Sequence, residues 1–205
     1  MNKGARELLD SIGSNPYFFN FLQKVCNLGD LKEEVSLRLK AEPGESILDV
    51  GCGTGLYSVL AKGRYVGLDL NGSYIKYART KYKSGNKKFI VEDVTRLSLG
   101  EEMFDKTLYI AMLHHFDEAD NIKILNRISS VTKKMVLILD AALPDNPTAA
   151  QKFFLKVERG QYVRPLNEQI SIVRKVFDIK NVSLVFNRSK FGLFSIIEAY
   201  PKGAV

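Results

Sequence analysis

Apolar residues in this chain form two kinds of pattern, short runs bounded by turn residues and longer stretches with helical spacing. The short runs predict buried β-strands, because a strand that is covered on both faces is apolar throughout. We expect such strands at residues 46–50, 65–70, 88–91, 106–112 and 135–140. The helical spacing between them predicts helices at residues 54–61, 73–82 and 118–131. Strands that alternate with helices indicate an α/β fold in which a parallel sheet lies between two layers of helices.

The two ends of the chain add helices and a final pair of strands. Helical spacing predicts N-terminal helices at residues 7–12, 16–27 and 31–39, and Asn15 before Pro16 suits the start of the second helix. After Asp140 the pattern predicts helices at 146–158 and 166–176 and strands at 181–187 and 193–200. These two strands are close enough in sequence to pair as an antiparallel hairpin at the edge of the sheet.

One strand leads directly into a glycine-rich turn. Residues Ile47 to Gly55 read Ile-Leu-Asp-Val-Gly-Cys-Gly-Thr-Gly, a buried strand followed by glycine at every second position. Glycine permits positive φ and close approach of a ligand to the backbone, and a helix that starts after the turn would direct free N–H groups at that ligand. In a parallel sheet such a turn lies at the carboxyl ends of the strands, where ligands bind. The stretch therefore predicts a binding loop for a small molecule.

Residues around the turn decide which ligand suits it. The dinucleotide fingerprint requires a glycine where this chain has Leu56, and no Gly-Lys-Ser/Thr of a P-loop follows the turn. Asp49 would repel a pyrophosphate and attract a cationic ligand. Asp69 ends the second strand, from which a carboxylate reaches ribose hydroxyls, and Asp93 after the third strand is placed to accept from an exocyclic amine. A ligand with a ribose, an adenine and a cationic amino acid end fits these charges. Turn or cap roles are the competing interpretation of both aspartates.

These motifs resemble those of the class I S-adenosylmethionine-dependent methyltransferases. Leu48–Gly55 is similar to the first motif of that family, Gly67–Leu70 to the second, Val91–Val94 to the third, and Phe104–Leu108 followed by Leu113–Phe116 to the fourth. The resemblance covers at least residues 45–140. It implies a Rossmann-like, doubly wound αβα fold with seven strands, the last inserted antiparallel. It also implies S-adenosyl-L-methionine as the methyl donor and S-adenosyl-L-homocysteine as the product.

The resemblance further implies a set of cofactor-binding residues. They are Asp49, Gly51, Gly53, Gly55, Asp69, Leu70, Asp93, Val94, Ala111 and Met112. The three glycines would face the methionine portion, and the residues that end the fourth strand, Ala111 and Met112, would line the sulfonium end. Asp69 would bind the ribose hydroxyls, while Asp93 would bind the adenine amine and Val94 the adenine ring through its backbone N–H.

Composition limits the class of protein. With 205 residues, 45% of them hydrophobic, the chain can bury one sizeable core. We expect a single domain over 1–205, with an N-terminal helical substrate or lid region at 1–44, a cofactor-binding core at 45–140 and substrate-side helices and two strands at 141–205. No apolar run approaches the length of a membrane span and the N-terminus lacks an apolar signal core, so we expect a cytoplasmic protein.

The two cysteines and the distribution of charge limit the kinds of site that the chain can contain. Cys26 and Cys52 make neither a disulfide framework nor a metal-ligand cluster, so we expect free thiols and no metal site. The net charge of +7 permits attraction to phosphates, but the basic residues are dispersed apart from the run at 81–88. We interpret that run as a solvated surface in preference to a nucleic-acid patch.

Candidate catalytic and substrate residues lie on either side of the expected cofactor. His114 and His115 are the only histidines in the chain, and either could accept a proton from a hydroxyl or amine, although pocket lining is the competing role. The substrate candidates are Tyr17, Phe18, Arg159, Tyr162 and Arg164. The two arginines could hold an anionic group of the substrate, or could cap helices instead.

The sequence thus predicts a methyltransferase that acts on an oxygen, nitrogen or carbon nucleophile of a small-molecule metabolite. Two alternatives stay open, an RNA methyltransferase and a protein that binds S-adenosylmethionine without catalysis. The absence of an Asn-Pro-Pro-Tyr motif after the fourth strand argues against amino methylation of adenine or glutamine. The methyl acceptor itself has no signature in the chain.

Overall fold

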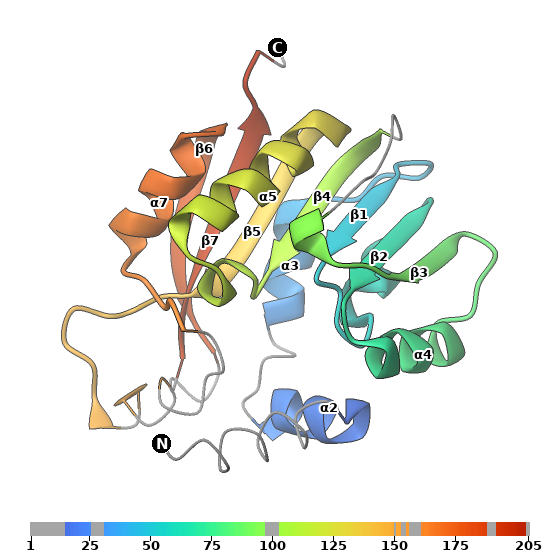
Figure 1. The fold of residues 1–205 in the computed structure, drawn as a ribbon, viewed down its shortest axis with the longest axis horizontal. Coiled ribbons are helices and arrows are strands. Elements are labelled where there is room, and N and C mark those ends of the chain that lie inside the picture. Colours follow the sequence, from blue (N-terminus) through green and yellow to red (C-terminus); the bar gives the residue numbers. More distant parts are fainter. Residues whose placement is uncertain are drawn as a thin grey trace.

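The computed structural model describes residues 15–25, 31–96, 103–149, 151–152, 155, 161–187 and 192–203. Within these residues seven strands form one sheet, in the spatial order β3-β2-β1-β4-β5-β7-β6 (Figure 1). They are β1 (Ile47–Val50), β2 (Tyr65–Asp69), β3 (Lys87–Val91), β4 (Phe104–Ile110), β5 (Thr132–Ala141), β6 (Phe177–Phe186) and β7 (Leu193–Pro201). Strands β1 to β5 are parallel, whereas β7 is antiparallel to both β5 and β6. The predicted mostly parallel, seven-stranded sheet with a C-terminal antiparallel hairpin is confirmed.

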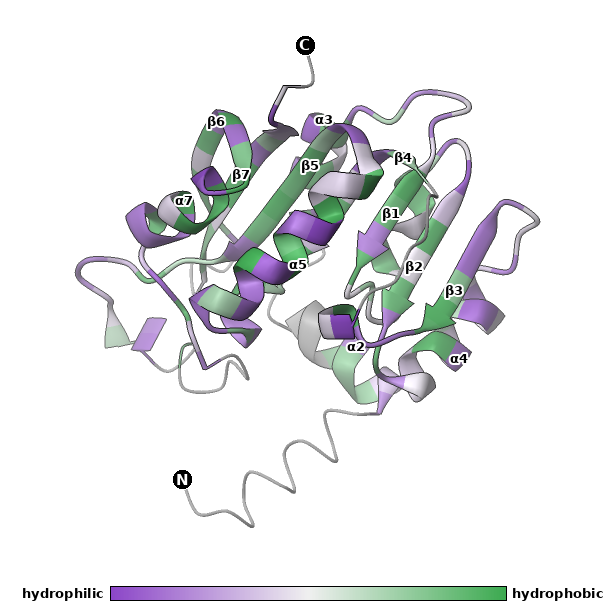
Figure 2. Cartoon of the chain, turned by 45° about the horizontal axis from the view of Figure 1, so that its top comes forward, coloured by the Kyte–Doolittle hydropathy of each residue, from purple (hydrophilic) through white to green (hydrophobic). Residues whose placement is uncertain are grey.

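Helices cover both faces of this sheet. On one face α5 (Glu118–Val131) and α7 (Leu166–Arg174) share an apolar cluster with Leu48 and Val50, and on the other α3 (Leu31–Leu39) and α4 (Gly72–Lys81) share one with Ile47. Neighbouring residues of a strand point to opposite faces, so an uninterrupted apolar strand is needed to fill both clusters. Figure 2 shows the central strands as mostly apolar between these helices. The predicted three-layer αβα arrangement is confirmed.

The helix predicted at 54–61 is wrong. The chain forms instead a short 3₁₀ helix, η2 (Leu56–Leu60), after Gly55 at φ 81°. The Gly55 N–H donates to the Cys52 carbonyl at 2.9 Å, so the glycine turn closes on itself before any helix begins. A 3₁₀ helix of one or two turns has little macrodipole, so the free helix N-terminus expected at the loop does not form.

Other boundaries differ less. Strand β6 begins at Phe177, where the sequence predicted Asn181, because a bulge between Ile179 and Asn181 interrupts its alternation. Of the helix predicted at 146–158, residues 149, 151–152 and 155 are helical in the structure. The rest of that stretch from 153 on, apart from 155, and the helix predicted at 7–12 lie outside the described residues.

The parallel order brings five strand ends to one edge of the sheet. Strands β1 to β5 end there, and helix α2 (Pro16–Val25) lies at the same edge beside α4 (Figure 1). Two further 3₁₀ helices, η3 (Val94–Arg96) and η4 (Leu113–His115), follow β3 and β4 at this edge. None of the helices in the described part of the chain is long and apolar enough to cross a membrane.

Candidate active site

The glycine loop after β1 is held by backbone hydrogen bonds to β2. The N–H groups of Gly51 and Cys52 both donate to the Leu68 carbonyl at 2.8 Å. Gly51, Gly53 and Gly55 have φ values of 79°, 54° and 81°, the left-handed region that side chains with a Cβ rarely adopt. The predicted need for glycine at these positions is therefore confirmed.

The space around each glycine shows that the three have different roles. A Cβ at Gly51 would lie 2.1 Å from Sδ of Met112, and one at Gly55 would lie 2.9 Å from the ring of Phe89. A Cβ at Gly53 would meet only the ring of Phe19, at an ordinary contact distance of 3.5 Å. A Cβ at Gly51 or Gly55 would thus meet another side chain, the flexible Met112 in the first case and the buried Phe89 ring in the second. At Gly53, by contrast, protein packing leaves room for a Cβ.

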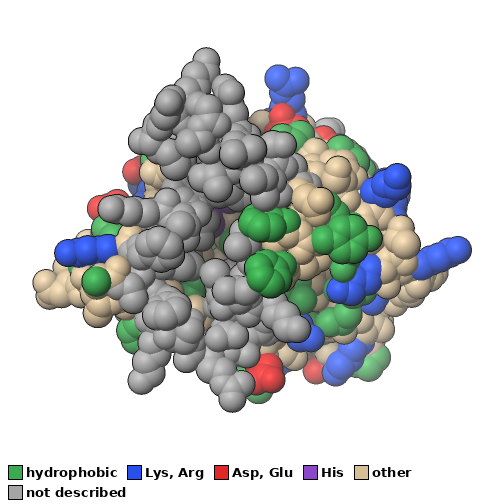
Figure 3. All heavy atoms as spheres, turned by 90° about the horizontal axis from the view of Figure 1, so that it is seen from below, with side chains coloured by type: hydrophobic (Ala, Val, Ile, Leu, Met, Phe, Trp, Pro, Cys, Tyr) green, Lys and Arg blue, Asp and Glu red, His purple; other side chains and the backbone are tan. Residues whose placement is uncertain are grey.

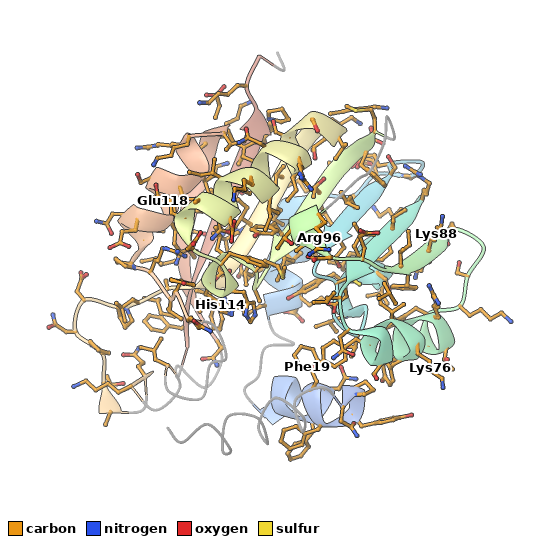
Figure 4. The ribbon with its side chains drawn as sticks, viewed as in Figure 1. Phe19, Lys76, Lys88, Arg96, His114 and Glu118 are labelled. Atoms are coloured by element: carbon orange, nitrogen blue, oxygen red, sulfur yellow. The ribbon has the colours of Figure 1, made fainter. Side chains whose placement is uncertain are left out.

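Helix α2 covers the loop at Gly53. The Thr54 hydroxyl donates to Oδ1 of Asn20 at 2.7 Å, and the Phe19 ring packs on the Tyr74 ring of α4 with centroids 4.8 Å apart. Figure 4 shows Phe19 on α2 below the carboxyl ends of the strands. The loop therefore lies between the sheet edge and an aromatic cover.

Asp49, the next-to-last residue of β1, has a buried carboxylate beside the glycine loop. It is 1% exposed and accepts a hydrogen bond from the Tyr65 hydroxyl at 2.5 Å. Burial raises the pKa of this carboxyl from 3.8 to about 7, with the Tyr65 hydrogen bond opposing and the charge of Asp69 adding to the rise. In the described part of the chain, no lysine or arginine forms an ion pair with Asp49. A cation at the loop would compensate this charge.

Asp69 ties the glycine loop to the end of β2. Its two carboxylate oxygens accept from the N–H groups of Gly53 and Asn71, each at 2.8 Å. Burial raises the pKa of the Cys52 thiol, and the nearby charges of Asp49 and Asp69 raise it further. Cys52 is accordingly a buried, free thiol with little thiolate character, and Cys26, which was also predicted to be a free thiol, lies outside the described residues.

Three residues predicted to bind the cofactor follow β2 and β3, namely Leu70 and the two assigned to its adenine, Asp93 and Val94. Asp93 accepts from the hydroxyl and the N–H of Thr95, and these hydrogen bonds, the hydroxyl first, lower the pKa of its carboxyl. Val94 is buried in the sheet cluster, whereas Leu70 is 69% exposed. Asp93 has the turn geometry that the competing interpretation expected, and its contact with an adenine stays a prediction.

The connection after β4 carries the histidines. Ala111 is a non-glycine residue at φ 55°, a strained conformation that turns the chain sharply at the sheet edge. Three residues later, Nδ1 of His114 lies 2.6 Å from Oδ1 of Asp140 at the end of β5, and the two side chains are 3% and 1% exposed. His115 is exposed, and its ring centroid is 4.3 Å from that of His114.

Two side chains hold this histidine turn in place. Arg164 donates through Nη1 to the Leu113 carbonyl at 3.0 Å and through Nη2 to the Phe116 carbonyl at 2.9 Å. The Asn121 amide donates to the same two carbonyls at 3.0 and 2.9 Å. Because both carbonyls accept twice, the backbone on either side of His114 is fixed from two directions.

Arg164 therefore has the structural role that competed with substrate binding, and its contact with a substrate anion stays a prediction. The remaining substrate candidates lie around the same edge. Tyr162 is 41% exposed, and its N–H donates to the His114 carbonyl at 2.9 Å. Tyr17 is 72% exposed and Phe18 is half-buried on α2. Arg159 lies outside the described residues.

Several residues of the site were missed in the sequence. Asp140, the partner of His114, ends an apolar strand as Asp69 does, and the neighbouring positions of β4 and β5 were the signal that could have identified it. Asn121 and Phe19 had no such signal, since an asparagine or a phenylalanine in an amphipathic helix is ordinary.

A surface depression of about 460 Å³ lies at the opposite, amino-terminal edge of the parallel strands. Lys106 donates to the Leu39 carbonyl there at 3.0 Å, and Arg38 pairs with Glu198 at 3.2 Å. This depression is remote from the glycine loop, so the site is placed by the loop and the histidine turn.

Comparison with known proteins places this geometry in context. Residues 47–135 match the sequence profile of a family described as "Methyltransferase domain". The chain is 30% identical over 137 residues to O-methyltransferase cnsE of Penicillium expansum. The aligned region covers 60% of this chain and 50% of that protein. It spans about half the length of the curated relatives that it matches.

Solved structures share the fold at lower identity. Magnesium protoporphyrin IX methyltransferase from Synechocystis PCC 6803, with bound SAH, superposes with a TM-score of 0.69 at 20% identity, over 89% of this chain and 88% of that one. The [4+2]-cyclase SpnF superposes with the same TM-score of 0.69 at 16% identity, over 84% of this chain and 81% of that one. At these identities the similarity concerns the fold, so the chemistry must be argued from the site.

Proposed function

We propose that this chain, which carries a class I S-adenosylmethionine-dependent methyltransferase domain, transfers a methyl group to a hydroxyl oxygen of a small molecule. The observation that carries the proposal is the buried His114–Asp140 pair at the strand ends, 2.6 Å between Nδ1 and Oδ1. Oxygen as the acceptor atom is supported by the name O-methyltransferase, which four of the matched relatives carry.

The glycine loop fits the charge of this cofactor. Asp49 is buried and has no basic partner in the described part of the chain, so a cationic ammonium or sulfonium would be stabilised beside it. The glycines at 51, 53 and 55, all at positive φ, leave the loop backbone without side chains, which suits the close approach of the methionine portion. Asp69 ends β2 where a carboxylate can accept from the ribose hydroxyls, and Asp93 and Val94 follow β3 on the adenine side.

His114 is the general base in this proposal. A carboxylate at Nδ1 holds the neutral imidazole in the tautomer with its proton on Nδ1, which leaves Nε2 as the nitrogen that accepts a proton. S-adenosylmethionine, when bound, would supply an electrophilic methyl group, whose bond to sulfur would break with the electron pair retained by sulfur as the acceptor oxygen bonds to the carbon. The hydroxyl proton passes to Nε2, and Asp140 stabilises the imidazolium that results.

Cofactor binding and methyl transfer can be tested separately. Isothermal titration of the full chain with S-adenosylmethionine and S-adenosylhomocysteine measures the first. The second uses methyl-labelled cofactor with a panel of phenols, carboxylic acids and aliphatic alcohols. We expect micromolar binding and label transfer to at least one hydroxyl compound. The absence of binding at millimolar cofactor would refute the cofactor assignment, and binding without transfer across the panel would favour a non-catalytic binding protein.

The role of His114 is tested with three variants. His114→Gln should lower kcat by about 100-fold or more and leave cofactor affinity within a few-fold, because general-base catalysis typically supplies 10²–10⁴ in rate. Asp140→Asn should lower kcat less and shift the acidic limb of the pH–rate profile, since it changes the tautomer and charge support of the imidazole. His115→Gln is the matched control and should keep kcat within about threefold. Equal losses for the two glutamine variants would contradict the assignment.

A further inference from the structure

The positive charge of the chain is concentrated in one segment. Residues 70–91 contain Lys76, Arg79, Lys81, Lys83, Lys87 and Lys88 and neither aspartate nor glutamate. Outside this segment 24 basic residues face 23 acidic ones, so the rest of the chain is nearly neutral. The net charge of +7 therefore comes almost entirely from α4, β3 and the turn between them.

These basic residues lie on the surface at one end of the sheet. Five of the six are exposed, and Lys87 is half-buried. Strand β3 is the edge strand on this side, so α4 and β3 together form a continuous basic margin. Figure 4 shows Lys76 and Lys88 both directed outward from this margin. No acidic residue lies within the segment, and the nearest carboxylates in the sequence, Asp69, Glu92 and Asp93, lie at its two ends, so the lysines of α4 and β3 keep a net positive field.

Exposed aromatic side chains lie next to the basic margin. Tyr17 and Phe21 of α2 are 72% and 59% exposed, and a separation of four residues places them on one face of the helix. The Tyr17 ring meets the Tyr77 ring of α4 edge-on, with centroids 5.5 Å apart. In Figure 3, seen from the side of the strand ends, hydrophobic side chains gather near the centre of this face, with lysines and arginines to their right.

An aliphatic side chain extends this apolar surface at the same sheet edge, since Val91 ends β3 and is 48% exposed. A soluble surface rarely gathers exposed aromatic and aliphatic side chains beside an acid-free basic segment. Protruding aromatic residues with flanking lysines are the pattern of interfacial membrane binding, in which the rings enter the headgroup region and the lysines meet anionic lipids.

We propose that the surface formed by α2, α4 and β3 docks on a membrane that contains anionic lipids. Tyr77 of α4 and Tyr82 directly after it favour this partner over single-stranded RNA, whose bases need open ring faces on which to stack. Lys81 lies over both the Tyr77 and Tyr82 rings, 5.3 and 5.2 Å from their centroids, and Lys87 lies 5.9 Å from the Tyr82 centroid. The ring faces in the basic margin are therefore already used by lysines, while Tyr17 and Phe21 project from a helix, as membrane anchors do.

Co-sedimentation of the full chain with vesicles tests the proposal. Vesicles of phosphatidylcholine are compared with vesicles that contain one-third phosphatidylserine, at low and at high salt. We expect binding to the anionic vesicles only, weakened by salt as the charge attraction is screened. Lys76→Glu with Lys81→Glu should weaken binding by at least about 25-fold, because each lysine near an anionic surface contributes about fivefold.

Matched controls separate this surface from general charge and general hydrophobicity. Lys133→Glu with Lys202→Glu makes the same change in net charge at the amino-terminal edge of the parallel strands, where both lysines are exposed. This pair should leave most of the vesicle binding intact. Tyr17→Ser with Phe21→Ser should weaken binding at least tenfold, whereas Leu37→Ser, on the 66% exposed Leu37 of α3, should not. Unchanged thermal unfolding of each variant shows that the fold is kept.

Three outcomes would overturn the proposal. They are no binding to anionic vesicles, an equal loss in the two lysine pairs, and binding to a labelled oligouridylate without binding to vesicles, which would assign the surface to RNA. The proposal does not depend on methyl transfer. The Lys76→Glu, Lys81→Glu variant should bind S-adenosylmethionine as the original chain does, so failure of vesicle docking and failure of the proposed function are distinguishable.

Discussion

Replacement of the buried Asp49 by asparagine should stabilise the fold while it weakens cofactor binding. The carboxylate is 1% exposed and has the Tyr65 hydroxyl as its hydrogen-bond donor at 2.5 Å. Its charge is thus desolvated with one donor to compensate it, and asparagine keeps an oxygen that the same hydroxyl can reach. The charge would be retained in this chain because a cationic ligand needs it.

The pKa of Asp49 gives the size and the sign of the effect. A carboxyl whose pKa rises from 3.8 unfolded to about 7 folded binds protons more tightly in the folded state. Its contribution to stability is full below about pH 4 and is lost as the pH rises to about 7. A difference of about 3 pH units corresponds to roughly 4 kcal/mol. We expect Asp49→Asn to raise the free energy of unfolding at pH 8 by about 2–4 kcal/mol, and by little at pH 4.5, where both side chains are neutral.

Urea unfolding at pH 4.5 and pH 8 measures this difference. Asp105→Asn is the matched control with the opposite sign. The Asp105 carboxylate accepts from the N–H and hydroxyl of Ser46 at 2.9 Å and pairs with Lys134 at 3.1 Å. The Ser46 N–H, then its hydroxyl and Lys134, lower the pKa of Asp105 from 3.8 to about 2. Its stabilisation is present above about pH 4 and lost below, so Asp105→Asn should cost about 1–2 kcal/mol at pH 8.

Titration with S-adenosylmethionine completes the test. Asp49→Asn should weaken binding by about 1–3 kcal/mol, the value of a hydrogen bond to a charged group. In the original chain affinity should fall between pH 7.5 and pH 5.5, because protonation of Asp49 removes the charge that attracts the ligand. An asparagine variant that is less stable than the original chain at pH 8, or equally different from it at both pH values, would refute the reasoning.

Four further substitutions probe the loop and the histidine turn. Asp69→Ala removes the acceptor of the Gly53 and Asn71 N–H groups, so we expect a lower Tm and cofactor affinity weaker by about 1–3 kcal/mol in calorimetry; unchanged affinity would leave Asp69 as a turn residue only. Gly53→Ala should lower the free energy of unfolding by about 1–2 kcal/mol, because its φ is positive, and should also weaken cofactor binding. Gly51→Ala should lower the free energy of unfolding further in urea, because its Cβ meets the Met112 side chain. Arg164→Lys loses the paired contacts to two carbonyls of the histidine turn, so kcat should fall about tenfold or more while cofactor affinity is kept; a changed KM with unchanged kcat would indicate substrate binding instead.

The strand pattern and the glycine loop were predictable because local physics determines them. A strand buried on both faces is apolar throughout, so 135–140 was identified within β5, and α5 was predicted with its observed bounds at 118–131. Positions 51, 53 and 55 have positive φ, which the glycines at these positions indicate in the sequence. The same local reasoning failed for residues 54–61, because the closed turn at Gly55 leaves no room for an α-helix before β2.

The sequence by itself determined the fold class and the glycine loop, and it predicted the charge that a ligand of this loop should carry. Only the tertiary structure decided which residues act together. Asp140 meets His114 across 26 positions because β4 and β5 are neighbours, and Arg164 reaches the Leu113 carbonyl across 51. It also separated Gly53, which faces Phe19, from two glycines at which a Cβ would meet another side chain. Pairings of this kind depend on strand order and side-chain direction, which no local pattern of residues encodes.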